Sequence, residues 1–122
     1  MKKLQILVVD DDRGCREITA EMLFELGNHE VTIAVNGQRA LALVDLCHFD
    51  IMVTDRQMPG MFGEELICRA KKIRPSIKTV LMTGDDLSPE ITAAINAAGT
   101  DAVLQKPFLM ADLRKILEEL FE

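Results

Sequence analysis

Short apolar runs alternate along the chain with longer segments in which apolar residues recur at helical spacing. The run at residues 4–9 is almost continuously apolar and rich in branched side chains, which predicts a strand buried on both faces. Four further short segments are predicted as strands. The five predicted strands are Leu4–Val9, Val31–Val35, Ile51–Thr54, Ile77–Thr83 and Ala102–Gln105.

Between these strands the apolar residues recur as they do on one face of an amphipathic helix. In the first such segment Ile18, Met22 and Leu26 form one stripe that we expect to face the core, and Gly27 is expected to end the helix. Asn36 is a typical N-cap residue for the second helix. The five predicted helices are Arg13–Leu26, Asn36–Leu46, Glu64–Ile73, Ser88–Ala98 and Leu109–Leu120.

Five strands alternating with five helices predict an α/β fold with a parallel sheet, because each helix returns the chain to the same end of the sheet. Right-handed crossovers place helices on both faces. No linker, repeat or low-complexity segment interrupts the pattern, so residues 1–122 are expected to form one domain. Ligands of such sheets bind at the carboxyl ends of the strands, so the residues that follow each strand are the candidates for a functional site.

The composition is that of a globular domain, with 48% hydrophobic and 28% charged residues. The net charge of -6 argues against sequence-independent binding of nucleic acid or of an anionic membrane, since both need a surplus of Lys and Arg. No stretch is long and apolar enough to span a bilayer, and the three cysteines are widely spaced without a C-x-x-C pair. We therefore expect a cytoplasmic protein with reduced thiols and no membrane segment.

Polar residues follow or end four of the five predicted strands. They are Asp10, Asp11 and Asp12 after the first strand, Asp55 after the third, Thr83 at the end of the fourth and Lys106 after the fifth. Because the carboxyl ends of parallel strands meet at one edge of a sheet, we expect these side chains to lie together.

The chemistry of this set is that of phosphoryl transfer. Three neighbouring carboxylates raise one another's pKa unless a cation lies between them, and Mg²⁺ with its preference for oxygen ligands fits that need. Lys106 would add a fixed positive charge, and Thr83 a hydroxyl group, toward the oxygens of a phosphoryl group. An accessible carboxylate would then be the nucleophile of an acyl phosphate.

Each residue also has a simpler explanation when taken alone. Asp12 precedes a helix and is a typical N-cap, Thr83 is a favourable strand residue, and a Lys-Pro pair such as Lys106-Pro107 is common in loops. Their occurrence in order at successive strand ends is much less expected by chance, which favours a shared site.

Four segments resemble the receiver domain of two-component response regulators, and the resemblance covers essentially the whole chain. They read ILVVDDD at 6–12, VTDRQMPG at 53–60, LMTG at 81–84 and AAGTDAVLQKPF at 97–108. The resemblance implies a flavodoxin-like, CheY-like α/β fold, in which a five-stranded parallel sheet of order 2-1-3-4-5 is flanked by five helices.

By position in these motifs, the resemblance implies that Asp55 is the phosphoacceptor. Asp10, Asp11 and Asp55 would hold Mg²⁺ together with the backbone carbonyl of Gln57. Lys106 would contact the phosphoryl group, and its bond to the following proline is expected to be cis.

The resemblance also implies a signalling role rather than a metabolic one. A histidine kinase or a histidine phosphotransfer protein would supply the phosphoryl group, and the domain would catalyse only its own phosphorylation and dephosphorylation. Thr83 would then move toward the phosphoryl group. This movement would remodel the face of the fourth helix, fifth strand and fifth helix, which controls an output domain or a partner protein.

The chain departs from the family pattern at one switch position. Val103 stands three residues before the lysine, where the family usually has Tyr or Phe, and a valine has no ring that could move together with Thr83. Gln57 and Asp85 flank the site at positions that vary in the family. The resemblance implies that side chains at these positions control the access of the water that attacks the phosphoryl group. His29 lies far from the motifs and is expected to be a structural or surface residue.

Several alternatives stay open from the sequence. The chain is either a complete single-domain regulator or the receiver of a longer DNA-binding regulator or hybrid kinase, and a homodimer through the last helices is compatible with both. An aspartate-nucleophile phosphohydrolase usually has a second Asp two residues after the nucleophile, where this chain has Gln57. A flavin- or dinucleotide-binding domain would need a Gly-rich or hydroxyl-rich phosphate loop after the first strand, and here aspartates would repel phosphate.

Overall fold

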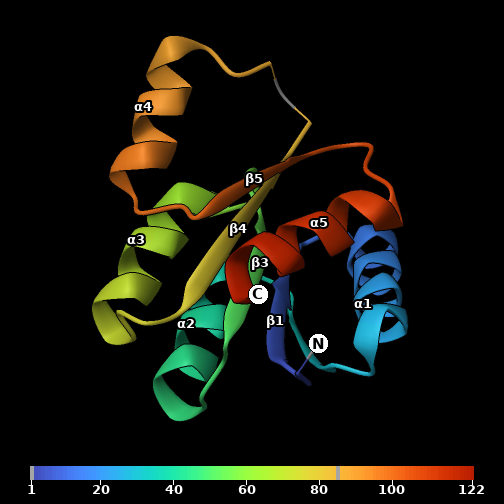
Figure 1. Cartoon of the computed structure of the whole chain (residues 1–122). Coiled ribbons are helices and arrows are strands. Elements are labelled where there is room, and N and C mark those ends of the chain that lie inside the picture. The colour runs from blue at the N-terminus through green and yellow to red at the C-terminus, as the bar shows by residue number, and fades with distance from the viewer. Residues whose placement is uncertain (1, 85) are drawn as a thin grey trace.

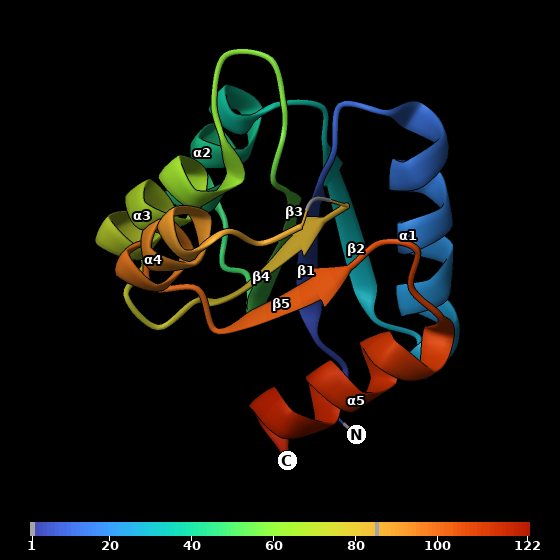
Figure 2. The same cartoon turned by 90° about the horizontal axis from the view of Figure 1, so that it is seen from above.

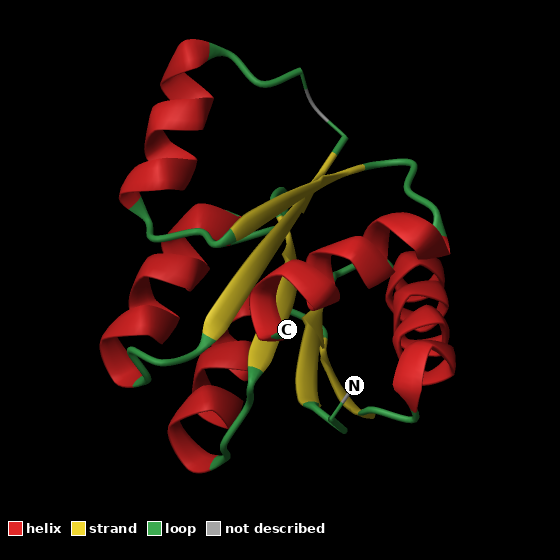
Figure 3. Ribbon diagram, in the orientation of Figure 1, coloured by secondary structure: helices red, strands yellow, loops and turns green. Residues whose placement is uncertain are grey.

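The computed structural model describes residues 2–84 and 86–122, in which five strands alternate with five helices (Figures 1 and 3). The strands are β1 (Gln5–Val9), β2 (Glu30–Ala34), β3 (Ile51–Asp55), β4 (Lys78–Thr83) and β5 (Ala102–Gln105). The helices are α1 (Arg13–Gly27), α2 (Gly37–Leu46), α3 (Gly63–Ile73), α4 (Pro89–Ala97) and α5 (Met110–Phe121). The order and type of every predicted element are confirmed. The predicted gating residue Asp85 lies outside the described residues.

The sheet is parallel throughout and has the order β2-β1-β3-β4-β5, as the family resemblance implied. Figure 2 shows α1 and α5 on one face of the sheet and α2, α3 and α4 on the other. The direction of winding reverses between β1 and β3, which places the carboxyl ends of these two neighbouring strands at the topological switch point.

Each face of the sheet has its own apolar core, because alternate side chains of a buried strand point to opposite faces. On one face, Leu7 of β1 and Met52 of β3 pack with α2, α3 and the buried Ile95 of α4. On the other face, Val8 and Val53 pack with α1 and α5. Ile95 is the one fully buried residue of α4, whereas each of the other helices buries two or more.

The predicted inward stripe of α1 is wrong at Ile18, whose side chain is 55% exposed. The buried positions are Thr19 and Leu23, with Met22 and Leu26 half-buried beside them. The core-facing stripe therefore runs one position later than the spacing of apolar residues indicated, since Thr19 takes a core position that hydrophobicity alone does not mark.

The predicted end of α1 at Gly27 is also wrong by one residue. Gly27 is helical, and Asn28 takes the left-handed conformation with φ of 53° while its N–H donates to the carbonyl of Phe24 at 2.7 Å. A Cβ at Gly27 would lie 2.8 Å from Nε2 of His29. The glycine therefore admits the close approach of a ring, and asparagine provides the left-handed cap.

His29 is buried, as a structural residue, and its Nδ1 accepts a hydrogen bond from the N–H of Leu4 at 2.9 Å. Burial lowers the pKa of His29 below its ordinary value of 6.5. Folding then favours the neutral ring, so the unfolded chain binds the additional proton. The stabilisation is complete above about pH 6.5 and is lost as the pH falls below this value toward the lower pKa of the folded protein.

We therefore expect the free energy of unfolding to fall between pH 7 and pH 5 through His29, because the unfolded chain takes up a proton that the folded chain does not. The change His29→Asn should remove this part of the pH dependence, and His48→Asn, at a largely exposed ring, should retain it. Urea unfolding followed by circular dichroism measures the effect. If the free energy of unfolding changed equally with pH in the wild type and in His29→Asn, the prediction would be contradicted.

Candidate functional site

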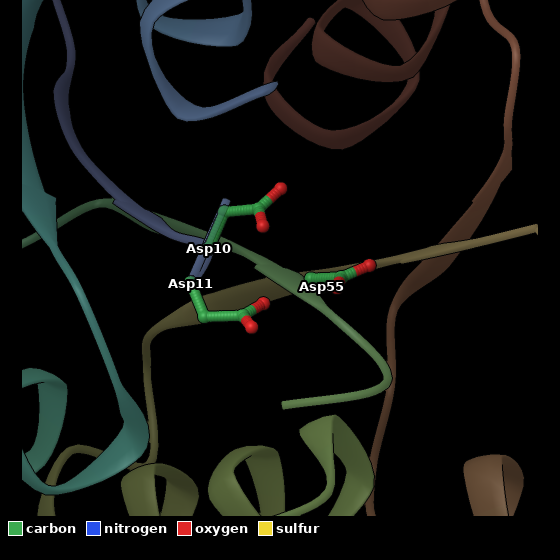
Figure 4. Close-up of side chains that lie close together, drawn as sticks. All are labelled: Asp10, Asp11 and Asp55. Carbon is green, nitrogen blue, oxygen red and sulfur yellow. The ribbon is translucent and has the colours of Figure 1, made fainter. Parts of the chain in front are cut away.

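Three carboxylates gather at the carboxyl edge of the sheet, at the switch point between β1 and β3. Asp10 and Asp11 follow β1, and Asp55 is the last residue of β3. One carboxylate oxygen of each lies within 4.8 Å of the others. Figure 4 shows the three side chains close together. Asp10 is fully buried, Asp55 is half-buried and Asp11 is exposed, so the cluster opens from the sheet toward solvent.

One oxygen of the buried Asp10 has no hydrogen-bond partner among the residues that the structure describes. Its Oδ1 accepts from the N–H of Asp12 at 3.0 Å, whereas Oδ2 is buried without a hydrogen bond and lies 3.6 Å from Nζ of Lys106. Burial raises the pKa of Asp10, and the charges of Asp55 and Asp11 add to this effect against the opposing Asp12 N–H and Lys106. An ionised Asp10 is thus short of positive charge.

Lys106 places a positive charge directly against the carboxylates. It follows β5, is joined to Pro107 by a cis peptide bond as predicted, and its Nζ donates to Oδ1 of Asp55 at 3.0 Å. Burial lowers the pKa of Lys106, but the hydrogen bond to Asp55 and the charges of Asp10 and Asp55 outweigh it and leave the pKa raised. Lys106 is therefore a fixed positive charge against the carboxylates.

A pocket of about 340 Å³ opens beside Asp55. Thr83, buried at the end of β4, lines it together with Arg56, Gln57, Gly84 and Lys106. The N–H of Lys106 donates to the carbonyl of Thr83 at 2.8 Å, which fixes the end of β5 against the end of β4. The structure thus brings Asp55, Thr83 and Lys106 to one pocket, as the sequence predicted.

Two of the predicted residues lie elsewhere. Asp12 is the N-cap of α1, where its side chain accepts from the N–H of Cys15 at 2.9 Å, and this hydrogen bond lowers its pKa. Val103 is 38% exposed on β5 and lines a different pocket, with Gln105 and Ile116. Asp12 therefore has the structural role that its position before a helix indicated, and the effect of a valine at the switch position of Val103 stays a prediction.

Sequence reasoning missed a second group of polar residues around the site. Arg16 of α1 donates to the backbone carbonyl of Asp10 at 3.0 Å. Arg56, which directly follows Asp55, is 9% exposed and pairs with Glu64 of α3 at 3.1 Å. The sequence did contain a signal for Arg56, since a charged residue directly follows a strand predicted to be buried. No role was predicted for it.

The donor set fits a hard divalent cation. Asp10, Asp11 and Asp55 offer carboxylate oxygens, and one oxygen of Asp10 is buried without a hydrogen bond. Mg²⁺ takes carboxylates, carbonyls and water rather than nitrogen or sulfur ligands. The three carboxylates carry more negative charge than Lys106 offsets, so a bound cation would relieve their repulsion.

A doubly wound parallel sheet with an acidic cluster and a lysine at its carboxyl edge defines a class of α/β regulatory domains. Residues 6–118 match the family model of the response regulator receiver domain, and the chain belongs to this family. It is thus a CheY-like receiver domain of two-component systems, a class that generally serves signalling rather than metabolic catalysis.

Similar curated proteins differ in length. Chemotaxis protein CheY-3 of Vibrio cholerae is 33% identical over 99% of this chain and 94% of its own length. A response regulator receiver protein of Anaeromyxobacter is 42% identical, and the match covers 83% of this chain but 42% of that protein. The DNA-binding transcriptional regulator NtrC of Azospirillum brasilense is 35% identical, and the match covers 24% of its length.

Solved structures of the family superpose closely on the model. Chemotaxis protein CheY4 of Vibrio cholerae has a TM-score of 0.90 at 29% identity, with 98% of this chain and 100% of that chain covered. A CheY-like receiver domain protein of Methanospirillum hungatei has a TM-score of 0.89 at 36% identity, with 98% and 94% covered. Among the described helices, none has the length and apolar character needed to cross a membrane.

Proposed function

We propose that this receiver domain is a phosphorylation-activated switch in which Asp55 accepts a phosphoryl group in a Mg²⁺-dependent reaction. The observation that carries the proposal is the 3.0 Å contact between Nζ of Lys106 and Oδ1 of Asp55, beside the buried Oδ2 of Asp10, which accepts no hydrogen bond from the described residues. A half-buried carboxylate held by a fixed cation, with a pocket in front of it, is suited to receive a phosphoryl group.

Four groups would hold the ion: the side chains of Asp10, Asp11 and Asp55 and the backbone carbonyl of Gln57. Bound Mg²⁺ would neutralise the carboxylates and the oxygens of the incoming phosphoryl group. The protein side chains would do the positioning. Lys106 would remain ion-paired at the site and contact a phosphoryl oxygen, and the hydroxyl of Thr83 would contact another.

The donor would be the phosphohistidine of a histidine kinase or of a histidine phosphotransfer protein. A carboxylate oxygen of Asp55 attacks phosphorus, a new O–P bond forms, and the P–N bond to the histidine breaks with its electron pair returning to the imidazole. Hydrolysis reverses the modification: water attacks phosphorus, inorganic phosphate leaves, and the carboxylate of Asp55 is regenerated.

The output would follow from a shift between two arrangements of the domain. Contacts of Thr83 and Lys106 to the phosphoryl group exist only in the active arrangement and therefore favour it. The face of α4, β5 and α5 would then bind an output domain or a partner protein. On this face Val103 replaces the usual ring, so the switch would act through Thr83 without a ring movement.

We propose the same chemistry for a chain that acts alone and for one that is part of a longer protein. Relatives of both lengths exist: the match covers 94% of CheY-3 but 24% of NtrC. Residues 1–122 would form one receiver domain, located in the cytoplasm, without direct binding to nucleic acid or membrane. Homodimerisation would be an additional property and is not needed for the switch.

Intact mass spectrometry after incubation with acetyl phosphate and Mg²⁺ tests the proposal. We expect the wild type to gain the mass of one phosphoryl group, and Asp55→Asn to gain none because an amide oxygen is a poor nucleophile. The exposed Asp45→Asn serves as a matched control and should be modified like the wild type. Omitting Mg²⁺ should abolish the adduct.

Two results would contradict the assignment. An adduct on Asp55→Asn would place the phosphoryl group on another residue. The absence of an adduct on the folded wild type, at any Mg²⁺ concentration, would count against phosphoacceptor function altogether.

A further inference from the structure

Arg56 is a charged residue buried next to the candidate phosphoacceptor. Its Nη2 lies 3.1 Å from Oε2 of Glu64, and the two side chains are only 11% and 14% exposed. Its guanidinium also lies over the ring of Phe62, 5.3 Å from the centroid. The pair Arg69–Glu65 on the same helix is about half exposed on both sides, so it lacks this enclosure.

The ion pair joins the two ends of the loop between β3 and α3. The loop is also closed by the N–H of Gly63, which donates to the carbonyl of Arg56 at 2.7 Å. On its other side, the N–H of Arg56 donates to the carbonyl of Met82 in β4 at 2.9 Å. The segment that carries Gln57 is therefore fixed at both ends, next to Asp55.

The pair is poorly explained as a device for stability. Buried ion pairs often cost as much in desolvation as they return in attraction. Moreover, Oε1 of Glu64 is buried without a hydrogen-bond partner, so the carboxylate is only partly satisfied. The ion pair holds the end of the loop in a fixed geometry beside the site. An apolar side chain buried at this position would not form this directional contact.

We propose that the Arg56–Glu64 pair, backed by Phe62, is a positioning element that holds the Gln57 carbonyl in place and thereby sets the Mg²⁺ affinity of the site. This inference rests on the proposed function, because it assumes that the acidic cluster binds Mg²⁺. Groups that orient metal ligands from outside the coordination sphere typically change metal affinity by about 10- to 100-fold when removed.

Isothermal titration calorimetry with Mg²⁺ on the full chain tests this inference. We expect R56Q and E64Q each to weaken binding by about tenfold. The double variant R56Q/E64Q should be no weaker than either single variant, since both changes remove the same contact. The controls R69Q and E65Q alter the exposed pair of the same helix and should bind within about twofold of wild type.

The two charges make the test discriminating. If the pair acted only through its electric field, R56Q would strengthen Mg²⁺ binding and E64Q would weaken it, and opposite shifts would overturn the proposal. Unchanged affinity in folded variants with lowered thermal stability would overturn it too. Removing one partner leaves the other charge buried, so if a single variant does not fold, R56Q/E64Q alone decides between tenfold weakening and no change.

Failure of the proposed function gives a different result. A wild-type chain that binds no Mg²⁺ would remove the basis of both proposals. A wild type that binds Mg²⁺ and is phosphorylated, with R56Q/E64Q equal to it in affinity, would refute only the role of the ion pair.

Discussion

Replacing Gly63 with Ala is expected to lower the free energy of unfolding by about 2 to 3 kcal/mol. The new Cβ would lie 2.5 Å from the carbonyl oxygen of Asp55 and 2.6 Å from Cδ1 of Leu81. The carbonyl belongs to the backbone of β3 and cannot rotate away, so the first turn of α3 must move off the sheet. Because this movement displaces the loop beside Asp55, Mg²⁺ binding should weaken as well.

Urea unfolding followed by circular dichroism measures the loss, since the chain has no tryptophan for fluorescence. Gly14→Ala is the matched control. Gly14 also lies at the start of a helix, but its Cβ would meet only Oδ2 of Asp12, at an ordinary 3.5 Å. We expect that variant to be as stable as wild type or up to about 1 kcal/mol more stable. Equal stability of Gly63→Ala and Gly14→Ala would refute the steric argument.

Asp10→Asn is expected to have the opposite effect on stability, a gain of about 1 to 2 kcal/mol in Mg²⁺-free buffer at neutral pH. The ionised Asp10 is fully buried near two other carboxylates, and one of its oxygens has no hydrogen-bond partner. An amide keeps an acceptor for the N–H of Asp12 and removes the charge. The same change should abolish stabilisation by added Mg²⁺.

The pH dependence gives this prediction its sign. Burial raises the pKa of Asp10 in the folded protein, so the folded state holds a proton that the unfolded state releases above its ordinary value of 3.8. The stability of the wild type relative to Asp10→Asn should therefore fall as the pH rises from about 4, and remain lower at neutral pH. Thermal denaturation of both proteins between pH 4 and pH 7, with and without Mg²⁺, measures it. A wild type more stable than Asp10→Asn without Mg²⁺ would contradict it.

The site could be predicted from the sequence because its residues lie at the carboxyl ends of strands in a regular alternation of strands and helices. Once five strands are recognised as parallel, Asp10, Asp55, Thr83 and Lys106 must share an edge, whatever the details of the loops. The resemblance to receiver domains then implied the order of the strands and the pairing of roles with positions.

Features that depend on packing between elements could not be predicted in the same way. The inward face of α1 passes through Thr19, a polar residue that is buried where the helix packs on the sheet. The left-handed cap lies at Asn28 and not at Gly27, whose missing side chain leaves room for the ring of His29. The pairing of Arg56 with Glu64 requires the loop between them to fold back, and no local pattern encodes that.

The single buried residue of α4 has an energetic consequence for the whole molecule. Displacing this helix from the sheet would expose Ile95 and the half-buried Ile91, whereas α3 would have to withdraw Leu66, Ile67 and Ala70 as well as its buried glycine. Regions with few buried side chains open at a small fraction of the global unfolding free energy. We therefore expect α4 to separate from the sheet at a lower free-energy cost than α3, while the strands that hold the acidic edge stay folded.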